Sequence, residues 1–285
     1  MPTNNTTHIY LVIVLYHPQE EDLRYFEHLG CTYQGCIVDN SEEAATGFSP
    51  GKLQYICNHR NLGIAEAQNI ALEQFFHHSN CTHVVFFDQD TRINTDYPKL
   101  IVKAFQDVQQ SVPRLALLGP TVRRLHSGEE YRSVIHRDHV IQHNFIQRRD
   151  VISSGCCISK DNLQKIGFND SRLFIDYVDY EWCWRAENSG YVCGITPHVS
   201  ISHKVGNREL RFPFGYRVIL SAPVRYFYQY RNFIWLSRRK YVPWQWKMAT
   251  GLKQAARLLY FPLFVKGGRE RFRYMVKGIL AGIKQ

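Results

Sequence analysis

Short apolar runs alternate with stretches of helical periodicity along the first part of the chain. The run Ile9–Leu15 precedes Glu20–Leu29, in which Leu23, Phe26 and Leu29 fall on one side of a helix. Such β-α-β alternation predicts a parallel sheet with right-handed crossovers, flanked by helices. The further predicted elements are strands at Cys36–Val38, Leu53–Cys57, Val84–Phe87 and Leu115–Leu118, and helices over 61–75 and Tyr97–Gln110.

The central predicted strand, Val84–Phe87, ends at the polar triplet Asp88, Gln89 and Asp90. Its continuous apolar character is typical of a strand buried on both faces of a parallel sheet. With a period of two, Asp88 and Asp90 point to the same side, at the carboxyl edge where α/β proteins bind ligands. Two carboxylates there suit a hard divalent cation that also holds phosphate oxygens. The alternative is a solvated turn after a strand.

Two other polar segments follow predicted strands. Asp39, Asn40 and Ser41 end the second strand, where an acid is well placed to bind a base or a ribose, although the triplet is also an ordinary turn. Residues 61–69 open a helix: Asn61 can cap it, and the small residues at 63, 65 and 67 allow a close approach of the backbone.

A second acidic cluster lies among aromatic residues in Phe174–Arg185. Helical spacing predicts Asp176, Asp179 and Cys183 on one face, with Glu181 turned away. A carboxylate near apolar rings can have its pKa raised toward the range of a general base, which makes Asp179 a candidate. The alternative is an acidic helix N-terminus that complements the helix dipole.

The segments around these clusters complete the predicted body. Residues 123–149 are weakly patterned and are predicted to be a functional loop or a hairpin excursion. Residues 153–158, Tyr191–Ile195 and Val199–Ile201 are predicted strands. His203 ends the last of these, either as a structural residue or as an imidazole that completes a carboxylate–histidine metal site.

Charge divides the chain unequally. The net charge is +10, yet residues 204–285 hold 18 Lys and Arg against two acids, which leaves residues 1–203 mildly acidic. We therefore expect two parts, residues 1–210 and a basic, aromatic, helical region 211–285. This region suits an anionic inner-membrane surface, with a homodimerisation arm as the alternative. Nucleic acid is not expected as a partner, since no binding module is recognisable.

The sequence also favours a reducing, cytoplasmic environment. Its eight cysteines form no CxxC pair, and several lie in apolar runs, so disulfides are not expected. The polar start lacks the features of a signal peptide, and no apolar run of about 18 residues predicts a transmembrane helix.

Taken in order, these motifs resemble the inverting family-two glycosyltransferases with a GT-A fold, and within them the bacterial rhamnosyltransferase subgroup. The resemblance covers roughly residues 8–210, and it implies a Rossmann-like, mixed and mostly parallel sheet flanked by helices. Two features differ from the commoner family pattern: Val178 replaces a Glu before Asp179, as in the rhamnosyl subgroup, and Tyr16 is followed by His17 instead of Asn. The motifs are Val38–Ser41, Asn61–Asn69, Phe87–Asp90, Phe174–Arg185 and His203 with Gly206.

The resemblance implies a role for each motif. Asp179 would be the catalytic base, and Asp90 with His203 would bind Mg²⁺ or Mn²⁺. Tyr177, Glu181 and Trp182 would contact the acceptor. The nucleotide-sugar donor would be bound by Tyr16, Asp39, Asn40, Asn61, Gly63, Ala65, Asn69, Asp88 and Gln89.

The expected activity is therefore metal-dependent transfer of a sugar with inversion. L-rhamnose from dTDP-L-rhamnose is the expected donor group, and a lipid-linked or oligosaccharide acceptor of a bacterial surface polysaccharide is the expected recipient. Another nucleotide sugar, such as a UDP-hexose, is the alternative. A nucleotidyltransferase is disfavoured, because residues 16–20 lack the Gly-rich, basic phosphate loop that such enzymes carry after the first strand. A non-enzymatic basic binding module would leave both acidic clusters unexplained.

Overall fold

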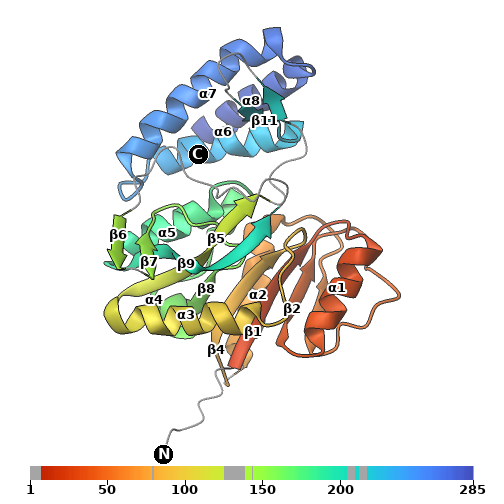
Figure 1. Ribbon diagram of the computed structural model, residues 1–285. Helices are drawn as coiled ribbons and strands as arrows, with labels where there is room; N and C mark the ends of the chain where they lie inside the picture. Colours follow the sequence, from red (N-terminus) through yellow and green to blue (C-terminus); the bar gives the residue numbers. More distant parts are fainter. Residues whose placement is uncertain are drawn as a thin grey trace, which may run out of the picture.

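The computed structural model describes residues 8–78, 80–124, 139–142, 144–203, 209–211 and 217–284. Within these ranges nine strands form one sheet in the order β3-β2-β1-β4-β8-β5-β9-β7-β6 (Figure 1). The strands are β1 (His8–Leu15), β2 (Gln34–Asp39), β3 (Leu53–Cys57), β4 (Cys81–Asp88), β5 (Leu115–Arg124), β6 (His139–Gln142), β7 (Phe145–Gln147), β8 (Cys157–Ser159) and β9 (Val192–His203).

The sheet is mixed, as predicted. Strands β1 to β4 are mutually parallel, and β5 is parallel to β9. Between these two groups β8 runs antiparallel to both β4 and β5. Two predicted strands are merged in β9, whose pairing with β5 is irregular between Thr196 and Ser200. The strand expected over 153–158 begins only at Cys157, because Gly155 adopts a φ of +81° in a turn that precedes it.

Helices cover both faces of the sheet. On one face α1 (Glu20–Gly30) and α3 (Tyr97–Ser111) bury apolar side chains such as Phe26 and Phe105. On the other face α2 (Gly63–His77), α4 (Lys160–Ile166) and α5 (Val178–Asn188) pack through residues that include Phe75 and Trp182. Because each buried large apolar side chain contributes about 1.5–3 kcal/mol, these two layers fix the strand ends that carry the acidic residues.

The basic C-terminal extension is helical, as predicted. After the ribbon β10 (Glu209–Arg211) and β11 (Arg217–Ile219), helices α6 (Pro223–Ser237), α7 (Trp244–Phe264) and α8 (Gly268–Ile283) pack around Tyr226, Tyr230, Phe261 and Met275. Figure 1 shows the three helices as a separate layer, over the end of the sheet toward which β5 and β9 point. Trp184 of α5 packs against Trp246 of α7, with ring centroids 4.8 Å apart, and this contact joins the layer to the body.

The state of the cysteines and the character of the helices bear on two predictions made from the sequence. All eight cysteines are free. Among the described residues, no helix combines the length and the apolar character needed to cross a bilayer.

The predicted helical face of Asp176, Asp179 and Cys183 is wrong. Helix α5 begins at Val178, after the short helix η1 (Ser171–Leu173) and a non-helical loop. In that loop Asp176 and Tyr177 have φ values of +65° and +67°, which the right-handed helix does not allow. Asp176 therefore stands outside the helix, and only Asp179 and Cys183 share its face.

Candidate active site

The site is built around the end of β4. The turn Ser153–Gly155 lies beside the last residues of β4, and the Gly155 N–H donates to the Phe86 carbonyl at 2.7 Å. The Asp88 N–H donates to Ser154 Oγ at 3.3 Å, and Ser154 Oγ lies 2.6 Å from Thr91 Oγ1. Ser154 is buried, so this turn fixes the backbone from which the Asp88 carboxylate projects.

The turn also links Asp88 to Asp179, which lies in the first turn of α5. Burial is the largest effect on Asp179 and, together with the charge of Asp88, it raises the pKa of this carboxyl to about 7. Hydrogen bonds from the backbone N–H groups of Tyr180 and Ser153 act in the opposite direction. Asp88 and Asp179 come from distant parts of the chain and interact electrostatically at one edge of the sheet. The raised pKa of Asp179 lies in the range in which a general base works.

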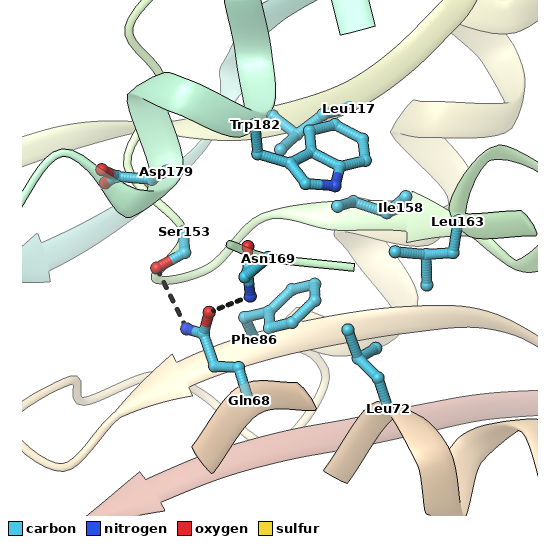
Figure 2. A pocket seen from close by; sticks show the side chains of 10 residues that line it. All are labelled: Gln68, Leu72, Phe86, Leu117, Ser153, Ile158, Leu163, Asn169, Asp179 and Trp182. Carbon is cyan, nitrogen blue, oxygen red and sulfur yellow. Dashed lines mark hydrogen bonds between the residues drawn. The ribbon is translucent and has the colours of Figure 1, made fainter. Parts of the chain in front are cut away.

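A small cavity extends from Asp179 into the body (Figure 2). Its volume of about 20 Å³ has room for about one water molecule. Gln68 spans the polar rim: its Nε2 donates to Ser153 Oγ at 3.3 Å, and its Oε1 accepts from Asn169 Nδ2 at 2.9 Å. Figure 2 shows the Asp179 carboxylate pointing away from Trp182, so its oxygens are directed away from the apolar lining.

Asp88 and Asp90 are the protein groups here that fit a divalent cation. Asp88 is partly buried at the strand end and Asp90 is exposed two residues later. A search of the described residues finds no group of three or more His, Cys, Asp or Glu able to hold a metal. Two carboxylates suit Mg²⁺ or Mn²⁺ when phosphate oxygens and water complete the shell. The backbone of His203 ends β9, paired with Arg124, whereas its side chain is outside the described part of the chain.

Asp39 lies at the end of β2, fully buried. Its Oδ1 accepts from the Ser41 N–H at 2.9 Å and from Ser41 Oγ at 2.5 Å, and its Oδ2 accepts from the Tyr55 hydroxyl at 2.7 Å. Asn40 is equally engaged: its Nδ2 donates to the Gly63 carbonyl at 3.1 Å. The strand end that was predicted to hold a base is therefore rigid and already hydrogen-bonded.

Tyr16 and Gln89 meet at the neighbouring strand ends, β1 and β4. The Tyr16 N–H donates to Gln89 Oε1 at 2.8 Å, and Gln89 Nε2 donates to Asp22 Oδ2 at 3.0 Å. The Tyr16 side chain is 46% exposed. Gln89 thus connects the loop after β1 to the acidic triplet, and the Tyr16 ring is available to a ligand at this edge.

The Asn61–Asn69 motif mainly supports the loop that precedes α5. Asn61 Oδ1 accepts from the Gly63 N–H at 2.9 Å, and the Ala65 N–H donates to the Phe174 carbonyl at 3.3 Å. A Cβ on Gly63 would stand 2.5 Å from the same carbonyl. Asn69 holds the backbone of Asn169 through two hydrogen bonds of 3.0 Å. These contacts favour a supporting role, and the predicted donor contacts of this motif stay predictions.

The three predicted acceptor residues are all packed. Trp182 is 3% exposed and donates through Nε1 to the Gly167 carbonyl at 2.9 Å. Glu181 is 1% exposed, and its Oε1 accepts from Arg239 Nη1 at 3.0 Å and from the Tyr241 hydroxyl at 2.6 Å. Tyr177 packs edge-on against Trp246, with ring centroids 5.1 Å apart. These contacts favour structural roles, and acceptor binding by these residues stays a prediction.

Sequence reasoning missed several residues that support the site. Ser153 and Ser154 lie in a segment that was predicted only as a strand, although its run of small residues was a usable signal. Gln68 and Asn169, which meet across about 100 residues of chain, gave no signal. Asn232 gave no signal either, because the sequence does not show that its amide is buried or which groups it contacts.

Comparisons with known proteins agree with this geometry. No family model matches the chain. The sequence is 29% identical over 290 residues to the "dTDP-rhamnosyl transferase RfbF" of Shigella flexneri, covering 96% of this chain and 94% of that protein. It is 20% identical over 225 residues to the "Low-salt glycan biosynthesis hexosyltransferase Agl10" of Haloferax volcanii, covering 76% and 73%.

Solved structures extend the comparison to the fold. S. aureus TarS residues 1–349 in complex with UDP-GlcNAc superposes with a TM-score of 0.54 at 13% identity, covering 96% of this chain and 81% of that one. GalNAc-T7 with UDP, GalNAc and Mn²⁺ has a TM-score of 0.56 at 12% identity, and this chain covers 57% of its length. The prediction of a glycosyltransferase with the GT-A fold is therefore confirmed.

Proposed function

We propose that the protein is a rhamnosyltransferase that moves L-rhamnose from dTDP-L-rhamnose to a hydroxyl of a growing bacterial surface glycan, with inversion. The observation that carries the mechanism is the position of Asp179 at the edge of the sheet near Asp88. Burial and the charge of Asp88 raise the pKa of the Asp179 carboxyl to about 7 there. Similarity over nearly the whole chain to a protein named a dTDP-rhamnosyl transferase supports the choice of donor. A UDP-hexose is the alternative donor.

In the proposed reaction the Asp179 carboxylate accepts the proton of the acceptor hydroxyl. The hydroxyl oxygen then forms a bond to the anomeric carbon as the bond from that carbon to the diphosphate oxygen breaks, and the nucleoside diphosphate leaves with the bonding electrons. A single displacement inverts the anomeric centre. Asp88 and Asp90 would hold a Mg²⁺ or Mn²⁺ ion, which when bound neutralises charge on the diphosphate.

Donor turnover tests this proposal. Purified protein is mixed with dTDP-L-rhamnose, UDP-glucose or UDP-GlcNAc, with Mn²⁺ or Mg²⁺ and a set of oligosaccharide and lipid-linked acceptors. We expect release of dTDP from dTDP-L-rhamnose above the rates for both UDP-sugars. Faster turnover of a UDP-sugar would replace the donor assignment, and release of pyrophosphate would indicate a nucleotidyltransferase instead.

We also propose that α7 rests on an anionic membrane surface, where a lipid-linked acceptor would be found. One face of α7 is exposed and apolar: Trp244, Leu259 and Leu263 are 68%, 75% and 76% exposed. Met248 and Leu252 lie on the same stripe at helical spacing. Residues 217–284 contain 15 Lys and Arg but Glu270 as their only acid, so lipid phosphates complement this surface. The location would be the cytoplasmic face of the inner membrane.

Vesicle flotation tests the membrane proposal. We expect binding to phosphatidylglycerol vesicles, weaker binding to phosphatidylcholine vesicles, and loss of binding in Leu252→Gln/Leu259→Gln. Leu100→Gln is the matched control, because Leu100 is an exposed leucine of α3 in the body. Concentration-dependent dimerisation through α7 without vesicle binding would overturn the proposal in favour of a homodimer.

A further inference from the structure

The loop that delivers Asp179 has a strained backbone. Phe174, Asp176 and Tyr177 have φ values of +65°, +65° and +67°, although none is a glycine. Residues with side chains rarely adopt this region, and such conformations persist only where the surroundings impose them. Helix α5 begins directly afterwards, so the direction of its first turn depends on this loop.

Helix α6 holds the loop through its backbone. Asn232 is fully buried, and its Nδ2 lies 2.8 Å from the Leu173 carbonyl, 2.8 Å from the Ile175 carbonyl and 3.1 Å from the Asp176 carbonyl. Arg231 adds donation from Nη2 to the carbonyls of Arg172 and Leu173, at 2.7 and 3.0 Å. One amide group thus gathers three carbonyl oxygens of the loop.

The same helix holds side chains of the loop. Arg225 contacts both oxygens of Asp176, with Nη2 at 2.6 Å from Oδ1 and Nε at 3.2 Å from Oδ2. The ring of Tyr228 stacks on Phe174, with centroids 4.5 Å apart and an interplanar angle of 7°. The bidentate ion pair and the stacked rings fix the two ends of the strained stretch.

The opposite side of the loop rests on α2. The Phe174 carbonyl accepts from the Ala65 N–H, and Gly63 leaves the space that the Phe174 ring and carbonyl occupy. The loop is therefore held between the N-terminus of α2 in the body and α6 in the C-terminal layer.

We propose that Asn232 is a positioning residue for the base, and that α6 belongs to the catalytic unit. This inference rests on the proposed function, in which Asp179 accepts the proton. Asn232 fixes the loop 173–176, the loop fixes the first turn of α5, and that turn aims the Asp179 carboxylate at the acceptor hydroxyl. A change of about 1 Å in such an aim can cost about 10²-fold in rate.

Asn232→Leu tests the proposal, because leucine has a similar shape but no donor. We expect kcat to fall about 10- to 100-fold while the KM for the donor nucleotide sugar stays within about twofold, since Asp39 and Asp88 are held by β2, β4 and the turn at Ser154 and not by the loop. The acidic limb of the pH profile should also move to lower pH, because a displaced carboxylate is better solvated.

Met275→Ala is the matched control. Met275 is fully buried in the core of α6, α7 and α8 and is absent from the contacts of the loop. It should lower the melting temperature and leave kcat and the pH profile unchanged below that temperature. If Asn232→Leu behaves like Met275→Ala, the positioning role is wrong. If the wild-type protein turns over no donor at all, the proposed function fails first.

A second variant decides the case if Asn232→Leu does not fold. Arg225→Lys keeps the positive charge beside Asp176 but loses the bidentate geometry. A lower kcat with a shifted pH profile and an unchanged donor KM would support the proposal. Unchanged kcat and pH profile in this folded variant would overturn it.

Discussion

The two acidic clusters of this protein reach the same edge of the sheet by different means. Asp88 and Asp90 follow a buried strand, and their position is given by β4 and by the turn at Ser154. Asp179 depends on a strained loop that is pinned by Asn232, more than 50 residues further along the chain. The donor side of the site is thus held by the sheet and the turn beside it, and the acceptor side by a loop that the C-terminal helices hold in place.

This difference predicts where the protein is sensitive to change. On the donor side, Asp39 is fixed by Ser41, two residues further along the chain, and by Tyr55 of the adjacent strand β3. On the acceptor side, removing the C-terminal helices would uncover Trp184 and release the loop before α5. Truncation at about residue 215 should therefore abolish turnover even though every predicted donor residue remains.

Among single substitutions, the largest effect is expected from Asp179→Asn. The amide cannot accept the proton of the acceptor hydroxyl, so kcat should fall by about 10²–10⁴-fold. Donor affinity, measured by calorimetry with dTDP and Mn²⁺, should remain within a few-fold, because the donor side does not depend on this group. Asp107→Asn, an exposed acid of α3, is the control and should retain full activity. Normal transfer by Asp179→Asn would show that another group is the base.

The next effect concerns Glu181, which lies in the same cluster as Asp179 by sequence. Its carboxylate is buried between Arg185 and Arg239, with the Tyr241 hydroxyl as a third partner. Glu181→Gln removes the negative charge that faces two partly buried guanidinium groups, of which Arg239 keeps its ion pair with Asp170, and should cost about 1–3 kcal/mol of unfolding free energy. Urea denaturation measures this loss. An altered acceptor KM at unchanged stability would instead favour the predicted acceptor contact.

The same contrast explains which parts of each cluster could be predicted from the sequence. The strand before Asp88 was predictable, because apolar continuity and the flanking helix periodicity are local signals. The non-helical start of α5 was not, because the residues of Phe174–Arg185 favour a helix locally and the override comes from Asn232 and Arg225. The packed state of Glu181 was equally hidden, since its partners Arg239 and Tyr241 lie about 60 residues away.

A smaller effect is expected at the proposed cation site. Asp90→Asn removes one of two carboxylates, so half-maximal activity should need at least about tenfold more Mn²⁺, with a modest loss of kcat at saturation. A titration of Mn²⁺ after treatment with EDTA measures this change. Glu73→Gln, at an exposed acid of α2 outside the Asn61–Asn69 motif, is the control. An unchanged metal requirement in Asp90→Asn would remove this residue from the metal site.

The smallest effect is a pH dependence of stability in the metal-free protein. The pKa of Asp179 is about 7 in the folded state, mainly through burial, against 3.8 as the ordinary value. Between these values the folded state keeps a proton that the unfolded state has lost, so this group lowers stability as the pH rises from about 4 to 7 and has no further effect above. Asp179→Asn lacks this loss. Its melting temperature relative to wild type, with EDTA present, should therefore increase by a few degrees between pH 5 and pH 8.

Asp107→Asn should show a constant difference over the same range. A constant difference for Asp179→Asn as well would mean that the carboxyl is not held in its raised-pKa environment, and the contrast between the two sides of the site would then lose its support on the acceptor side.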